Sequence, residues 1–180
     1  RVPTYWGDQP LTAPYYVGAI SIFLLIFGLL ILKSHEKNWL LYLFIFSIIL
    51  SMGNNLDFIN NLFFDYLPGY NKFRSVTFII IISIFSVVLI SVLGIEKFIS
   101  SPQKFKKELF QTVLITISIY SIIFLSSFAL SFSGKVDANF INYPEWFLDS
   151  LVKDRKSLYF GDLLKGGFFI IVLILSFYGV

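Results

Sequence analysis

Two basic residues that follow a proline–glycine pair are the strongest candidates for binding chemistry in this sequence. Lys72 and Arg74 come shortly after Pro68-Gly69 and just before a long apolar run. Because Pro-Gly signals a turn, both residues are expected beside the start of a helix, where free N–H groups attract anions. Arginine binds phosphate through two hydrogen bonds and lysine acts as a point charge. A lipid phosphate or diphosphate is the predicted ligand, and interfacial anchoring is the alternative.

Further polar candidates lie elsewhere in the chain. Asp8 and Gln9, within the hexapeptide YWGDQP at residues 5–10, are predicted to line the same ligand cleft. The alternative is an interfacial turn, since tryptophan and tyrosine anchor at headgroups. Asp57 and Asp65 are candidate acid/base groups or metal ligands, although Asp57 lies in an asparagine-rich stretch typical of a polar loop. No glycine-rich phosphate loop, HExxH motif or Ser/His/Asp arrangement identifies a catalytic residue.

No pattern indicates a cofactor, a metal site or a nucleic-acid partner. The sequence has no cysteine, which excludes disulfides and thiolate metal sites. Its single histidine, His35, lies in a short charged loop. The basic residues lie near the ends of apolar segments instead of forming tracts with interleaved aromatic residues, so nucleic-acid binding is not expected.

The elements that position these residues are predicted to be membrane helices. The chain is 57% hydrophobic and 14% charged, whereas soluble domains carry roughly 25% charge. The apolar residues fall in blocks near the roughly 20 residues that a bilayer requires. We predict one polytopic all-α integral membrane segment, with about five transmembrane helices and short interfacial helices. The predicted spans lie near residues 15–32, 39–56, 76–95, 109–132 and 163–180.

The third apolar run shows why helices are favoured over strands. Between residues 78 and 92 the polar residues are Ser83, Ser86 and Ser91, so the run lacks the alternation of a membrane β-strand. Only helices and closed barrels satisfy every backbone group in lipid. Each serine is expected to satisfy its hydroxyl on its own helix backbone.

The density of lysines in the loops predicts which side of the membrane each loop faces. The short loops at residues 33–38 and 96–108 are rich in lysine, which places them in the cytoplasm by the positive-inside rule. Residues 1–14, 54–75 and 133–162 then lie outside. Because the chain starts at Arg1 and stops inside an apolar run, we interpret it as an internal segment of a longer protein.

A helix along the outer headgroups is predicted near residues 143–158. Pro144 suits a helix start, and the stretch carries too many charges for the bilayer centre. Arg155 is a residue of this predicted surface helix. The Ser101-Pro102 pair predicts a second short interfacial helix on the opposite side.

Three motifs in order resemble the YfhO family of bacterial membrane proteins. They are YWGDQP followed by Tyr16-Val17-Gly18, then DYLPGYNKFR at residues 65–74, then Asp154-Arg155, Ser157-Leu158 and Asp162. The resemblance implies similarity to C-type glycosyltransferases, which use polyprenyl-phosphate sugars outside the membrane. Such enzymes keep their catalytic acid in an early outer loop that precedes this segment. We therefore transfer no catalytic residue, and note that Lys165 stands where an arginine is expected.

The function predicted from this resemblance is a membrane module of a glycosyltransferase in the bacterial inner membrane. It would use a polyprenyl-phosphate-linked sugar to modify a cell-envelope glycan or lipid, with membrane lipids as its other partners. The segment alone is expected to be inactive. A transporter or lipid flippase is the first alternative and would need broken helices, for which Gly166-Gly167 is the only hint. A non-catalytic membrane scaffold is the second.

Overall fold

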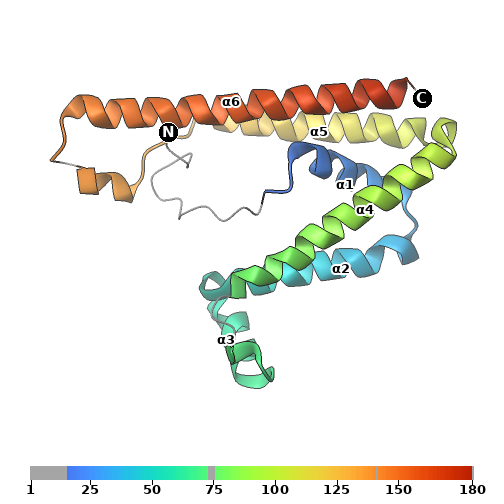
Figure 1. Cartoon of the computed structure of the whole chain (residues 1–180), viewed down its shortest axis with the longest axis horizontal. Helices are drawn as coiled ribbons and strands as arrows, with labels where there is room; N and C mark the ends of the chain where they lie inside the picture. The colour runs from blue at the N-terminus through green and yellow to red at the C-terminus, as the bar shows by residue number, and fades with distance from the viewer. Residues whose placement is uncertain (1–15, 73–75, 141, 180) are drawn as a thin grey trace. The chain divides into compact units, whose positions relative to one another are not determined.

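The computed structural model describes residues 16–72, 76–140 and 142–179, and these contain helices but no β-strand (Figure 1). The α-helices are α1 (Ala19–Ile31), α2 (Ser34–Ser51), α3 (Asp57–Tyr66), α4 (Ile80–Ser100), α5 (Lys106–Ser126) and α6 (Glu145–Tyr178). The 3₁₀ helices are η1 (Gly53–Leu56), η2 (Tyr70–Lys72), η3 (Val76–Ile79), η4 (Pro102–Phe105) and η5 (Lys135–Phe140). The all-helical fold predicted from the apolar runs is confirmed for this part of the chain.

Three of the described helices are long and apolar enough to cross a membrane, which indicates a membrane protein. They are Thr77–Ser100, Pro102–Ser126 and Trp146–Tyr178. They contain most of the predicted third, fourth and fifth spans. The first two predicted spans correspond to α1 and α2, of 13 and 18 residues. α1 is short of the roughly 20 residues that a bilayer core requires, and α2 begins with charged residues. The predicted number of five spans is therefore not confirmed.

The C-terminal part of the chain differs from the two elements predicted near residues 143–158 and 163–180. Both belong to one helix, α6, which runs without interruption for 34 residues (Figure 1). The physical reason lies in residues 159–162, where Gly161 is the one helix-disfavouring residue besides Asp162. A single glycine costs only about 1 kcal/mol relative to alanine in a helix, and no proline stops the helix.

The described residues fall into two compact units, one within Tyr15–Thr112 and one within Val113–Val180. In the first unit α4 contacts both α1 and α2. Two glycines allow a close approach of α1 and α4: a Cβ on Gly94 would lie 2.8 Å from the Cα of Gly28. Small residues serve this purpose where membrane helices cross, because they bring the backbones together.

Serine hydroxyls add hydrogen bonds to the same unit. As predicted, Ser86 and Ser91 donate to carbonyls one turn earlier in α4. Ser83 departs from the prediction, because it donates to the carbonyl of Phe44 in α2 over 3.0 Å and also bonds the Ser47 hydroxyl. A buried hydroxyl thus links α4 to α2, a contact that the sequence pattern did not indicate.

Ionic contacts organise the loop between α1 and α2. The Lys37 ammonium donates to the carbonyl of Leu29, near the C-terminal end of α1, where positive charge is favoured. Glu36 accepts from the ammonium of Lys97 in α4 over 2.8 Å. This hydrogen bond and the one from the Lys33 backbone lower the pKa of the Glu36 carboxyl. Lys37 and Lys97, which belong to the two predicted cytoplasmic loops, therefore have structural partners.

In the second unit, α6 lies alongside α5 and the segment that joins them. The Tyr159 hydroxyl donates to the carbonyl of Ile123 over 2.7 Å, and Phe160 meets Phe124 edge to face. Further along the two helices an apolar groove of about 820 Å³ separates them, and no charged side chain lines it.

Candidate functional site

The predicted binding region begins with a tight turn at Leu67–Tyr70. The Tyr70 amide donates to the Leu67 carbonyl over 3.1 Å, and Gly69 has a φ of 87°. This is the pattern of a type II turn, with proline at the second position and a left-handed residue at the third. A side chain at position 69 would be strained even though the space around it is open. The Pro-Gly turn signal is confirmed.

Tyr70 fastens this turn to α3. Its side chain is 3% exposed, and its hydroxyl donates to Oδ1 of Asn60 over 3.0 Å. Its ring lies 6.0 Å from that of Phe63, which meets Phe46 of α2 at 5.8 Å. Burial raises the pKa of the Tyr70 hydroxyl above its ordinary value, so it stays a neutral hydrogen-bond donor at physiological pH.

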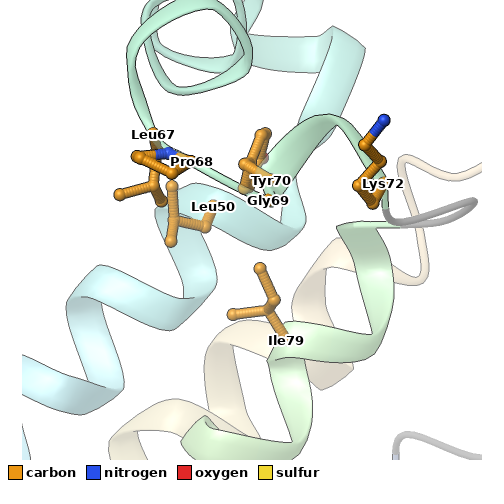
Figure 2. A pocket seen from close by; sticks show the side chains of 7 residues that line it. All are labelled: Leu50, Leu67, Pro68, Gly69, Tyr70, Lys72 and Ile79. Carbon is orange, nitrogen blue, oxygen red and sulfur yellow. The ribbon is translucent and has the colours of Figure 1, made fainter.

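A cavity of about 420 Å³ lies beside this turn. Figure 2 shows the side chains that line it, contributed by the end of α2, the turn, η2 and η3. These residues are Leu50, Leu67, Pro68, Gly69, Tyr70, Lys72 and Ile79. The walls are mainly aliphatic, and Lys72 is the charged residue among them. This combination suits a ligand with an apolar body and an anionic group.

Lys72 stands at the edge of the cavity. Its side chain is exposed, and its ammonium points away from Leu50 and Ile79 in Figure 2. The Lys72 amide donates to the Gly69 carbonyl over 3.1 Å, so the turn fixes the backbone that carries the charge. The ammonium is placed to meet an anion outside the cavity while apolar groups of the same ligand enter it.

The structure places one of the four predicted ligand-binding residues. Asp8, Gln9 and Arg74 lie outside the described residues, and Lys72 lies at the cavity. Asp57 and Asp65, the candidate acid/base or metal groups, are exposed in α3 and do not line the cavity. Within the described ranges no three His, Asp or Glu residues come together as a group that could hold a metal ion.

Comparison with known proteins assigns no relative to this chain. No protein-family model, curated protein or solved structure matches it. The resemblance to the YfhO family stays a prediction from the three sequence motifs.

A second polar site, missed by the sequence analysis, lies where the segment between α5 and α6 folds back on α6. Arg155 is 4% exposed, although it belongs to the stretch predicted to lie along the headgroups. Its guanidinium donates two hydrogen bonds to Asp137, each of 2.8 Å, and one of 3.0 Å to the Phe132 carbonyl. Lysine could not replace Arg155 here, because only the planar guanidinium makes this bidentate pairing.

We call Arg155, Asp137 and the Phe132 carbonyl the Arg155 clamp, and further contacts hold it in place. Asp137 also accepts from the Gly134 amide over 2.9 Å, and Phe132, with a φ of 56°, packs edge to face on Tyr159. The Arg155 hydrogen bond is the main cause that lowers the pKa of the Asp137 carboxyl. No motif signals this pair, since the two residues are 18 positions apart and each looks like a solvated charge in the sequence.

Proposed function

We propose that this chain is the membrane module of a glycosyltransferase in the bacterial inner membrane. The enzyme uses a polyprenyl-phosphate-linked sugar to modify a cell-envelope glycan or lipid. The single observation that carries this proposal is the apolar cavity beside the Pro68-Gly69 turn with Lys72 at its edge. An isoprenoid phosphate has the matching chemistry, since its hydrocarbon part enters an apolar cavity and its phosphate pairs with a cation.

The polar part of the proposed site extends beyond Lys72. Arg74 would bind the phosphate through two hydrogen bonds, while Asp8 and Gln9 contribute polar groups to the same cleft. A hydrogen bond to a charged group contributes about 1.5–3 kcal/mol, so loss of one cation weakens binding roughly tenfold or more. The catalytic residues belong to parts of the parent protein that precede this segment.

The proposed orientation follows from the lysine-rich loops at residues 33–38 and 96–108. These loops face the cytoplasm, and residues 1–14, 54–75 and 133–162 face outward. The Lys72 cavity then opens on the outer side, where polyprenyl-phosphate sugars are consumed by the enzymes that this sequence resembles. Five membrane crossings, with α1 and α2 as the first two, satisfy this arrangement.

One observation disfavours the transporter or flippase alternative. Such proteins bind substrate at interrupted helices, and Gly166-Gly167 was the hint of an interruption. α6 continues through both glycines without a break. No observation favours a non-catalytic scaffold, and the experiment below distinguishes it from an enzyme.

The test uses the full-length parent protein. Lys72→Gln and Arg74→Gln should each reduce polyprenyl-phosphate binding and envelope glycosylation roughly tenfold, with membrane insertion checked in parallel. Lys153→Gln is the matched control, since Lys153 is an exposed lysine of α6. Arg155 is unsuitable as a control because it is buried.

Two results would count against the proposal. If both substitutions leave lipid binding and glycosylation unchanged, the cavity is not the phosphate site and the two cations are interfacial anchors. If the parent protein transfers no sugar at all, the scaffold is favoured.

A further inference from the structure

An aromatic cluster gathers where the segment after α5 enters α6. Tyr143 and Phe147 are stacked, with their ring centroids 4.9 Å apart, and Phe140 lies 5.7 Å from Tyr143 and 5.6 Å from Phe147. Trp146 meets Phe147 at 6.2 Å. Phe140 and Phe147 are half-buried, whereas Tyr143 is 53% and Trp146 66% exposed. Two large aromatic side chains are thus presented to the surroundings on a base formed by two others.

The Arg155 clamp holds this cluster in place. Phe140 is the last residue of η5, and Asp137 of the same η5 is bound by Arg155 of α6. The clamp therefore ties the residue beneath Tyr143 to the helix that carries Trp146. Such preorganisation lowers the entropic cost of binding, and tyrosine and tryptophan have few rotatable bonds to immobilise.

The length of α6 would hold this cluster away from a bilayer that its apolar end crosses. Asp162 is the last acidic residue before the apolar end of α6, and Trp146 lies sixteen residues before it. At 1.5 Å per residue the two are about 24 Å apart along the helix. Each headgroup layer adds only about 5–8 Å to the hydrocarbon core. If the apolar end crosses the membrane, Tyr143 and Trp146 lie in water beyond the headgroups, where interfacial anchoring cannot explain them.

The size and polarity of the patch indicate the ligand. Two aromatic side chains bury about 150–250 Å² each, well below the roughly 800 Å² per partner of a stable protein interface. Asn139 and Asn142, which are exposed, are the sequence neighbours of Phe140 and Tyr143. Aromatic faces carry partial negative charge, which attracts the weakly positive C–H groups of a sugar ring, and amides bond sugar hydroxyls. A few sugar rings fit this patch better than a folded partner does.

We propose that Tyr143 and Trp146 form a binding site for a neutral oligosaccharide, outside the membrane and independent of the Lys72 cavity. The site requires no enzymatic activity of the parent protein. It holds a glycan chain by stacking on the exposed rings, with Phe140, Phe147 and the Arg155–Asp137 pair keeping those rings in position.

Binding is tested by calorimetric titration of the chain in lipid nanodiscs with cellohexaose and, separately, chitohexaose. We expect saturable binding of at least one probe, and a roughly tenfold loss in Trp146→Ala, as for a central aromatic contact. Trp39→Ala is the matched control, since Trp39 is a half-exposed tryptophan of α2. No binding of either probe, or equal losses in the two variants, would overturn the proposal.

The position of the patch is tested by fluorescence. The chain has three tryptophans, so replacing Trp6 and Trp39 with phenylalanine leaves Trp146 as the reporter. We expect its emission to change on addition of the bound oligosaccharide and to be unaffected by brominated lipids. Quenching of Trp146 by brominated lipids would place it in the headgroups and identify it as a membrane anchor instead.

Discussion

Arg155 and Asp137 form an ion pair whose side chains are only 5% and 12% exposed. Removal of one partner from such a pair leaves an uncompensated buried charge, which costs about 3–5 kcal/mol. We expect Asp137→Asn to loosen residues 127–144 and to be detected as faster limited proteolysis of this segment. Asp149→Asn, which changes an exposed aspartate of α6, is the control and should leave proteolysis unchanged. Equal protection in both variants would show that the pair does not hold the segment.

The same pair predicts a pH dependence. Arg155 lowers the pKa of Asp137 below the ordinary value of 3.8. A carboxyl whose pKa is lower in the folded state stabilises that state above its ordinary pKa, and this stabilisation is lost as pH falls through the lowered value. Protection of residues 127–144 should therefore hold at neutral pH and decline below about pH 4. Asp137→Asn should remove this component of the pH profile, and a profile unchanged by the substitution would contradict the assignment.

At the scale of the helices, the crossing of α1 and α4 depends on two glycines. A Cβ on Gly94 would come within 2.8 Å of the Gly28 Cα. Because this is a backbone atom, the clash cannot be relieved by rotating a side chain. We expect Gly94→Ala to separate the two helices and lower the thermal unfolding temperature in detergent. Gly161→Ala is the matched control, since nothing lies within 4 Å of the added methyl group. It should be neutral or stabilise α6 by about 1 kcal/mol. Equal effects of both substitutions would contradict the close crossing.

The uninterrupted helix α6 is longer than a bilayer core is thick. A helix of 34 residues is about 51 Å long, whereas a bilayer core is about 30 Å thick. Its polar half must then extend away from the membrane if its apolar half crosses. The structure thus joins the two elements predicted near residues 143–158 and 163–180 into one helix, whose first half carries the Arg155–Asp137 pair and part of the aromatic cluster.

For the whole molecule, the proposed orientation is tested by cysteine labelling. Cysteines at Ser34 and Gln103 should react only with a reagent that crosses the membrane, and cysteines at Asn61 and Asn139 with an impermeant one. All four positions are exposed. Asn61 is chosen for labelling instead of the neighbouring Asn60, because the Asn60 side chain accepts a hydrogen bond from the Tyr70 hydroxyl. The reverse pattern, or labelling of all four sites alike, would refute the orientation.

The sequence by itself determined that the chain is helical and membrane-like. Only helices and closed barrels pair every backbone group in lipid, and long apolar runs without the alternation of a barrel strand favour the helix. The Pro68-Gly69 turn was equally readable, because a left-handed third residue requires glycine or asparagine. These features are local, so their residues alone carry the information.

Only the tertiary structure decided which faces of these helices meet. A helix that is apolar all round has no polar stripe to show its packed side, so the Gly28–Gly94 crossing and the Ser83 bond to α2 were invisible in the pattern. The burial of Arg155 was hidden for a related reason: its cost is offset by Asp137 and the Phe132 carbonyl, both supplied by the preceding segment only once it folds back. The sequence alone does not show whether a charged residue is solvated or paired, because its partner is brought close only by the fold.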